Sequence, residues 1–205
     1  MKALIFDFDG VLADSFDAFY QLIQASFSSV GLKLTENQYR DFLLGNVHSA
    51  FRKMILEDEY YQEFLEFRRQ HFDQYYSTVK LFPEVSEFVK KVFGKCPLAI
   101  ASSGKPEHIV RLLLAAGIRD NFKAISANEQ LSKEAMILEM LDQLQVHPNE
   151  AAFISDTVGD LKLARRLDLQ AIAVSWGFHG AETLKSVKPD FLAADFNKLL
   201  RYFGA

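Results

Sequence analysis

The start of the chain constrains the fold most strongly, because a short apolar run leads directly into two aspartates and a glycine. Residues 2–6 read Lys-Ala-Leu-Ile-Phe, and Asp7, Phe8, Asp9 and Gly10 follow. An apolar run that ends at a turn signal is typical of a buried parallel strand. Asp7 and Asp9 then lie at the carboxyl end of that strand and on one face, where their charges repel unless a cation or a shared proton compensates.

Two other interpretations of this motif have to be weighed. Asp and Gly are common turn formers, so the motif could be only a polar turn after a strand. A calcium-binding loop fails on spacing, since counting from Asp7 puts Leu12 where the loop needs glycine and Ala18 where it needs an acid. Matching polar groups at the ends of later strands would favour an active site over a turn.

The composition limits the partners and the compartment. Of the 205 residues, 49% are hydrophobic and 24% are charged, and the net charge is −4 without a basic block, so we expect no nucleic-acid partner. No apolar stretch approaches the roughly 20 residues of a membrane span, and we expect no signal peptide before the first strand. Because the single Cys96 also suits a reducing compartment, we predict a cytoplasmic monomer or homodimer with no membrane partner.

Between residues 14 and 77, strand-like runs are absent and large, mostly aromatic residues recur at helical spacing. They are Phe16, Phe19, Tyr20, Ile23, Phe27, Tyr39, Phe42, Leu43, Phe51, Met54, Ile55, Phe64, Phe67, His71 and Tyr75. Gly31 and Gly45 indicate helix ends, and Thr35 three residues before Gln38 matches a capping box. We predict four helices packed as a small bundle, with these residues as its core rather than as the lining of a ligand pocket.

After residue 80, short apolar runs alternate with helical patterns, which predicts a parallel sheet with right-handed crossovers. The expected strands are residues 97–101, 123–126, 151–154, 170–174 and 191–192. The expected helices are residues 83–92, 106–116, 132–144, 160–167 and 197–202. We predict an α/β fold, in which a doubly wound, Rossmann-like parallel sheet core of residues 1–14 and 80–205 has an inserted helical-bundle cap of residues 15–79.

Polar side chains follow the ends of these strands, where doubly wound folds have their sites. The set is Asp7, Asp9, Ser102, Asp156 and Asp160, with Lys133 at the start of a helix between them. A polar-turn explanation would need three separate coincidences, so we favour an active site. The set suits phosphoryl transfer, because carboxylates such as Asp7 and Asp156 bind Mg²⁺, which screens an anionic nucleophile from an anionic phosphate.

Each side chain has an expected role in this chemistry. Asp7 is the nucleophile and forms an aspartyl-phosphate, and Asp9 is the general acid and base. Ser102 and the backbone N–H groups after it bind phosphate oxygens beside a helix N-terminus. Lys133 neutralises the phosphate and the nucleophile, and Asp160 orients metal-bound water or binds the metal. The expected phosphate-binding residues are thus Gly10, Ser102, Ser103, Gly104 and Lys133.

Taken singly, the same residues have structural explanations. Ser102 could cap the helix that follows it, and Asp156 and Asp160 could be helix-start acids, which the helix dipole favours. Lys133 could be a solvated lysine, although a cation is unfavourable at a helix N-terminus, and Lys105 is an alternative phosphate-binding lysine. Three histidines lack metal-ligand spacing and are expected at the surface or in local polar contacts, namely His108, His147 and His179.

Taken together, the motifs resemble those of the haloacid dehalogenase superfamily of aspartate-nucleophile phosphatases. The first motif matches residues 7–15, Ser102 fits the second, Lys133 the third, and residues 156–160 the fourth. Two further segments resemble the tail of the phosphoglycolate phosphatase-like group, residues 174–178 and 188–191. The resemblance implies Mg²⁺ as cofactor, bound by Asp7, Asp156 and the backbone carbonyl of Asp9, with Asp160 as a further candidate ligand.

The resemblance also sets some members of the superfamily aside. Dehalogenases lack the second acid of the first motif, so Asp9 implies a phosphoryl substrate. A related mutase has a cap histidine where this chain has Phe19, which argues against a phosphomutase. The cap segment 44–48 resembles the specificity loop, with His48 where relatives tend to have Arg or Lys. Asn46 and His48 are expected to face the leaving group.

Two residues depart from the family pattern. Ser155 stands where a glycine usually precedes the aspartate of the fourth motif, and it would add a hydroxyl near the metal. Glu134 stands where a proline usually follows the lysine of the third motif. Its negative charge would weaken phosphate binding if the side chain pointed inward.

The sequence therefore predicts a phosphatase whose helical cap closes over a small phosphorylated metabolite, with phosphoglycolate as the first candidate. One alternative is a phosphomutase of the same superfamily, which Phe19 disfavours. The other is a non-catalytic, phosphate-binding regulatory protein, which would have no need of the acid and base Asp9.

Overall fold

The chain folds into two compact units. The structure, a computed structural model, describes residues 1–45, 47–128 and 131–204. One unit consists of residues 1–14 and 81–205, and the other of residues 15–80. The boundary lies one residue beyond the predicted one.

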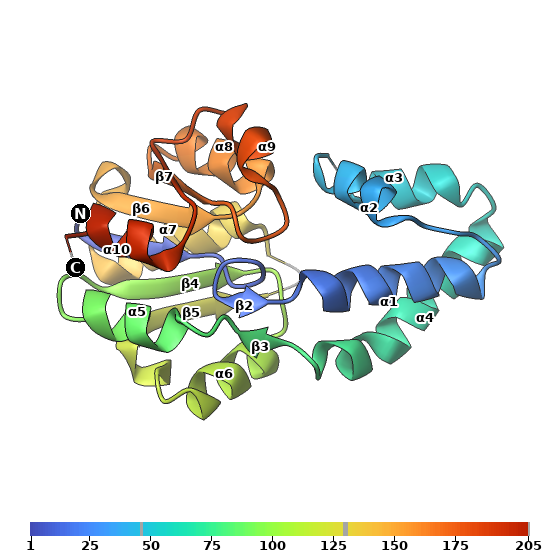
Figure 1. Cartoon of the computed structure of the whole chain (residues 1–205), viewed down its shortest axis with the longest axis horizontal. Helices are drawn as coiled ribbons and strands as arrows, with labels where there is room; N and C mark the ends of the chain where they lie inside the picture. The colour runs from blue at the N-terminus through green and yellow to red at the C-terminus, as the bar shows by residue number, and fades with distance from the viewer. Residues whose placement is uncertain (46, 129–130, 205) are drawn as a thin grey trace. The chain divides into compact units, whose positions relative to one another are not determined.

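A six-stranded parallel sheet forms the centre of the α/β unit (Figure 1). In sheet order the strands are β5 (Phe122–Ala127), β4 (Leu98–Ser102), β1 (Ala3–Phe6), β6 (Ala151–Ser155), β7 (Gln170–Val174) and β8 (Phe191–Ala193). All neighbouring pairs are parallel. If only these six strands are numbered along the chain, their order in the sheet is 3-2-1-4-5-6, which is the Rossmann order. The direction in which strands are added to the sheet reverses beside β1. The predicted fold class is confirmed, and the carboxyl ends of β1, β4 and β6 frame the switch point.

Helices bury both faces of this sheet. They are α5 (Val85–Val92), α6 (Pro106–Ala115), α7 (Lys133–Leu144), α8 (Val158–Arg166), α9 (Ala181–Lys185) and α10 (Phe196–Tyr202). Ile5 of β1 belongs to a core cluster that includes Met140 of α7. Phe6 points to the opposite face, where its ring lies 5.9 Å from that of Phe88 in α5, and Phe88 packs on Phe196 of α10. Burial on two faces explains why β1 and β4 are apolar throughout.

The second unit is helical and has a core of its own. Its helices within the described residues are α1 (Phe16–Ser29), α2 (Glu36–Leu43), α3 (Val47–Met54) and α4 (Asp58–Tyr76). The rings of Phe27, Phe51 and Phe64 pack together with centroids 4.9 to 5.6 Å apart. The predicted capping box is present, because Thr35 accepts from Gln38 N while the Gln38 side chain accepts from Thr35 N. That this unit acts as a cap remains a prediction.

The structure differs from the predicted boundaries mainly at helix starts. Helix α8 begins at Val158 rather than at Asp160, because the Thr157 side chain caps it by accepting from Asp160 N at 3.3 Å. Helix α5 begins at Val85, two residues after Pro83. Five short elements without a periodic signal were not predicted: β2 (Ala13–Asp14), β3 (Lys80–Leu81), α9, and 3-10 turns at Arg119–Asn121 and Pro148–Glu150. Among the described residues, no helix has the length and apolarity needed to cross a membrane.

Candidate active site

The loop after β1 fixes the first aspartate at the carboxyl edge of the sheet. Asp7 N donates to the carbonyl of Ile154 in β6 at 2.9 Å, and Phe8 N donates to the Asp7 carboxylate at 2.8 Å. The Phe8 carbonyl accepts from Leu12 N at 2.9 Å, which closes a tight turn. Gly10 in this turn has a φ of +75°, a conformation that only glycine adopts without strain. The Asp7 side chain is therefore buried at the point where β1 meets β6.

Lys133 joins two of the predicted acids. Its Nζ lies 2.9 Å from Asp7 Oδ2 and 2.8 Å from Asp160 Oδ2, and all three side chains are mostly buried. Burial alone would lower the pKa of Lys133, but the charges of Asp160 and Asp7 outweigh it, so this pKa lies above the usual range of a lysine. Lys133 is therefore a permanent cation beside the Asp7 carboxylate.

The two carboxylates that share Lys133 differ in pKa. Burial raises the pKa of Asp7 well above its usual value, although the charge of Lys133 opposes the shift. Burial would also raise the pKa of Asp160, but the ion pair with Lys133 outweighs it and leaves this pKa below its usual value. Asp160 is thus the ionised partner that holds Lys133, while a further cation near Asp7 would favour its ionised form.

Ser155 has a function in this cluster that its sequence position did not reveal. Its Oγ donates to Asp160 Oδ2 at 2.8 Å and accepts from Thr157 N at 3.2 Å. The hydroxyl predicted to lie near the metal thus helps to orient the carboxylate that holds Lys133. Glu134 pairs with Arg166 at 2.6 Å on the exposed side of α7, so its charge is engaged away from Lys133.

Asp156 is fully buried at the end of β6. Its Oδ2 accepts from Phe178 N at 2.7 Å, whereas Oδ1 has no hydrogen-bond partner among the described residues. Burial raises the pKa of Asp156 to about 7, and the hydrogen bond from Phe178 N opposes part of the shift. A buried carboxylate oxygen without a donor is costly, and a bound cation would remove that cost.

The residues present fit a magnesium ion. Within residues 1–45, 47–128 and 131–204, no three His, Cys, Asp or Glu side chains gather closely enough to hold a metal by themselves. Mg²⁺ usually takes only one or two carboxylates and keeps several waters. Asp156 Oδ1 and the Asp7 carboxylate, whose pKa the charge of Asp156 raises further, provide that donor set.

The second motif lies beside the first. Ser102 ends β4, is buried, and accepts from Gly104 N at 3.0 Å. A Cβ atom on Gly104 would lie 3.3 Å from both Asp9 Oδ2 and Ser102 Oγ. Asp9, the predicted general acid and base, and Ser102, the predicted phosphate ligand, therefore both lie next to the backbone of Gly104. The Ser103 side chain is exposed.

Three other predictions have different outcomes. Asn46 lies outside the described residues. His48 lies in α3, where burial and the charge of Arg68 lower its pKa, and its role towards a leaving group stays a prediction. Of the two places predicted for His179, the surface or a polar contact, the structure shows the second, because this buried side chain accepts from Val158 N through Nδ1 at 3.1 Å at the start of α8.

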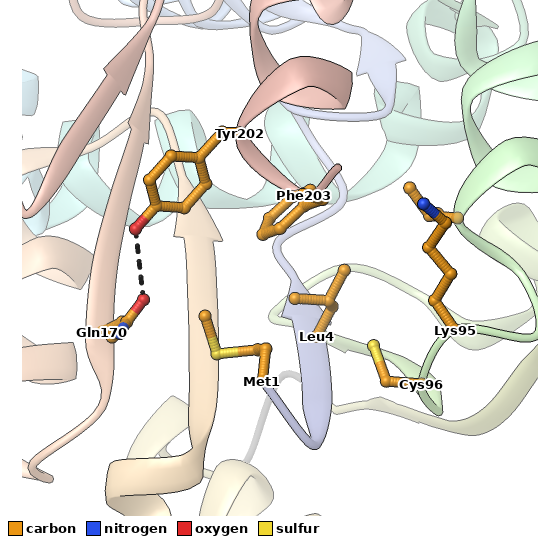
Figure 2. A pocket seen from close by; sticks show the side chains of 8 residues that line it. Met1, Leu4, Lys95, Cys96, Gln170, Tyr202 and Phe203 are labelled. Carbon is orange, nitrogen blue, oxygen red and sulfur yellow. Dashed lines mark hydrogen bonds between the residues drawn. The ribbon is translucent and has the colours of Figure 1, made fainter. Parts of the chain in front are cut away.

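A separate cavity of about 420 Å³ lies at the opposite edge of the sheet (Figure 2). Its lining residues are Met1, Leu4, Val92, Lys95, Cys96, Gln170, Tyr202 and Phe203. Figure 2 shows the Tyr202 hydroxyl directed towards Gln170, to whose side-chain oxygen it donates at 3.3 Å. Gln170 begins β7 and Cys96 precedes β4, so this cavity borders the amino ends of the strands and is distinct from the cluster around Asp7.

This chain is similar in sequence to known proteins over most of its length. The family model described as haloacid dehalogenase-like hydrolase matches residues 4–174. A phosphoglycolate phosphatase from Synechococcus elongatus is 26% identical over 205 residues, which cover 98% of this chain and 96% of that protein. Pyrophosphatase PpaX from Oceanobacillus iheyensis is 23% identical over 210 residues, which cover 100% of this chain and 97% of that protein.

A solved structure supports the same fold. A haloacid dehalogenase-like family hydrolase from Streptococcus pneumoniae matches with a TM-score of 0.87 and 24% identity, and the match covers 99% of this chain and 98% of that one. The family model covers far more than half of this chain and includes all four motifs. The chain therefore belongs to the haloacid dehalogenase-like hydrolases.

Proposed function

We propose that this hydrolase is a Mg²⁺-dependent phosphatase that cleaves a small phosphomonoester through an aspartyl-phosphate on Asp7. The main support is the cluster at the carboxyl edge of the sheet, where Lys133 pairs with Asp7 at 2.9 Å. A nucleophilic carboxylate, a permanent cation beside it and a buried Asp156 oxygen open to a metal are what phosphoryl transfer from a dianionic ester needs.

In the first step a carboxylate oxygen of Asp7 attacks phosphorus. The bond to the leaving oxygen breaks, and Asp9 donates a proton to that oxygen. Lys133 holds the Asp7 carboxylate and neutralises charge on the transferred group, while Ser102 and the backbone of Gly104 bind phosphate oxygens. The products are an aspartyl-phosphate and the free alcohol.

In the second step water hydrolyses the aspartyl-phosphate. Asp9, now a carboxylate, accepts a proton from the attacking water, and inorganic phosphate leaves with Asp7 restored. Asp7 and Asp156, with the backbone carbonyl of Asp9, would hold Mg²⁺, which when bound screens the nucleophile from the phosphate and offsets charge in the transition state. Asp160 keeps Lys133 in position, with direct metal contact as its other proposed role.

We further propose a phosphoglycolate-like substrate, supported by the relatives that bear the name phosphoglycolate phosphatase at 21 to 26% identity. The helical unit would close over the substrate as a cap and exclude water. Its predicted contacts with the leaving group are Asn46 and His48. The single Cys96 supports a cytoplasmic location, and a small phosphorylated molecule is the proposed partner.

Phosphate release from a panel of phosphorylated metabolites tests this function. The panel contains phosphoglycolate, pyrophosphate, sugar phosphates and nucleotides, each with Mg²⁺ and with chelator. We expect chelator-sensitive turnover that Asp7→Asn lowers about a thousandfold or more, because the amide cannot act as the nucleophile. Turnover in Asp7→Asn as fast as in the wild type would contradict the assignment of Asp7 as the nucleophile.

A second assay separates catalysis from mere phosphate binding. Beryllium fluoride with Mg²⁺ mimics a phosphoryl group on an aspartate, so it should raise the melting temperature of the wild type and not that of Asp7→Asn. Turnover of no ester together with no shift would favour the non-catalytic phosphate-binding alternative. Conversion of one sugar phosphate into an isomer without phosphate release would favour a phosphomutase.

A further inference from the structure

The loop after β7 lies against Asp156 and against the first loop of the chain. Phe178 N donates to Asp156 Oδ2 at 2.7 Å. Trp176 Nε1 donates to the Val11 carbonyl at 3.1 Å, and its ring lies 4.5 Å from that of Phe196 in α10. The loop is thus bonded both to the carboxylate and to the first loop of the chain, although the proposed reaction assigns no step to it.

Gly177 lies in the tightest part of this contact. A Cβ atom there would lie 2.1 Å from Asp156 Oδ2 and 2.3 Å from the Gly10 carbonyl oxygen, far closer than real Cβ contacts. The φ of Gly177 is not in the left-handed range, so glycine is needed for space rather than for its backbone freedom. A Cβ on Gly10 would meet the same Asp156 oxygen at 2.0 Å. The backbones of two chain segments therefore both lie directly against Oδ2.

From this geometry we infer that residues 176–178 are a positioning segment that makes Asp156 a one-oxygen ligand and thereby favours Mg²⁺ over Ca²⁺. The inference rests on the proposed function, because it takes Asp156 as a metal ligand. Oδ2 is enclosed and hydrogen-bonded, which leaves Oδ1 to face a cation.

The two cations differ in what they ask of a carboxylate. Mg²⁺ requires near-octahedral geometry at about 2.1 Å with single oxygens, whereas Ca²⁺ accepts six to eight ligands and often takes both oxygens of one carboxylate. A segment that keeps Oδ2 from the metal therefore does not weaken the binding of Mg²⁺, but it removes one possible oxygen ligand of Ca²⁺. Loosening the segment should weaken Mg²⁺ binding and lower the preference for Mg²⁺.

Gly177→Ala and Gly180→Ala form a matched pair for the test. Gly180 is in the same loop, has a φ of −72°, and a Cβ there would meet no atom within 4 Å. Metal-free full-length protein is titrated with Mg²⁺ and with Ca²⁺ by calorimetry. We expect Gly180→Ala to bind both as the wild type does. We expect Gly177→Ala to lose about tenfold or more in Mg²⁺ affinity and less in Ca²⁺ affinity.

Trp176→Phe keeps the test decisive if Gly177→Ala does not fold. It removes the indole N–H bond to Val11 and keeps an aromatic ring against Phe196. The preference for Mg²⁺ should fall about threefold. An unchanged ratio of the two affinities in Trp176→Phe, or an equal loss for both cations in a folded Gly177→Ala, overturns the inference.

Asp156→Asn distinguishes this inference from the proposed function. A wild type whose Mg²⁺ affinity does not depend on Asp156 overturns the inference, whatever the phosphatase assay shows. Suppose instead that the wild type binds Mg²⁺ through Asp156 and that Gly177→Ala lowers the preference for Mg²⁺, but that the wild type hydrolyses no phosphoester. This result overturns the proposed function and supports the inference.

Discussion

Lys133 shows how strongly one buried charge can hold a site together. It is the shared partner of Asp7 and Asp160, so its removal leaves two buried carboxylates facing each other. We expect Lys133→Met to lower the free energy of unfolding by about 3 kcal/mol at pH 7.5 in chelator. The loss should be smaller at pH 5, because without the lysine the pKa of Asp160 rises and protonation relieves the repulsion. Urea unfolding at the two pH values measures both.

The control for Lys133 is a salt bridge on the surface of the same helix. Glu134 pairs with Arg166 with both side chains well exposed, so Glu134→Gln should change stability by less than about 1 kcal/mol at either pH. A loss in Lys133→Met that does not depend on pH would mean that packing, rather than charge, is what the lysine provides.

The free energy of unfolding should depend on pH through Asp156, because burial raises the pKa of this side chain from 3.8 to about 7. Between these values the folded protein binds a proton that the unfolded chain does not, so this group makes the free energy of unfolding fall as pH rises to about 7. Asp156→Asn removes the effect. Between pH 5.5 and 8.5 in chelator, the variant should therefore gain about 2 kcal/mol relative to the wild type. A constant difference would contradict the raised pKa.

At the scale of elements, helix caps hold the site residues in register. Thr157 caps α8 through Asp160 N, and Asp195 caps α10 through Lys198 N at 2.7 Å. Removing either cap, by Thr157→Ala or Asp195→Ala, should cost about 1 kcal/mol of stability. Only Thr157→Ala should also lower kcat, because Asp160 lies in the turn that it caps and holds Lys133. Equal kcat values in the two variants would contradict a role for the α8 cap in catalysis.

Strand ends were the predictable part of the site. The sequence predicts β1, β4 and β6 from their apolar runs. Because parallel strands have their carboxyl ends at one edge of the sheet, it also predicts that Asp7, Ser102 and Asp156 lie close together. The structure places Lys133 2.9 Å from Asp7, in keeping with its expected role of neutralising the nucleophile, whereas its unfavourable charge at the start of α7 had only favoured a functional role.

Side-chain partners were the unpredictable part. The hydrogen bond of Ser155 to Asp160, the pair of Glu134 with Arg166, and the enclosure of Asp156 by the loop after β7 all depend on tertiary packing. No spacing along the chain encodes which of several neighbours a polar group will meet. The sequence offered residues 174–178 only as a segment that resembles the tail of a related group, with no contact assigned to them.

At the scale of the whole molecule, each unit has its own hydrophobic core, so the two should be separable. The strands β2 and β3, where the chain passes between the units, pair with each other, so a short Gly-Ser linker can replace residues 15–79 and keep both strands. We expect the remaining α/β unit to fold and bind Mg²⁺ but to discriminate less among phosphoesters. Circular dichroism, Mg²⁺ titration and KM values for the substrate panel measure this. Unchanged selectivity among the phosphoesters would contradict the proposed role of the helical unit as a cap.

The central position of β1 has a consequence for synthesis on the ribosome. Its neighbours are β4 and β6, so Ala3 can find its partner Ala151 only after nearly three quarters of the chain has been made. At roughly 5–20 residues per second, the first strand waits on the order of ten seconds without its sheet. The helices of residues 15–80 are close neighbours in the chain and can fold during that interval. The nascent protein should therefore acquire protease resistance in its inserted segment before β1 becomes protected.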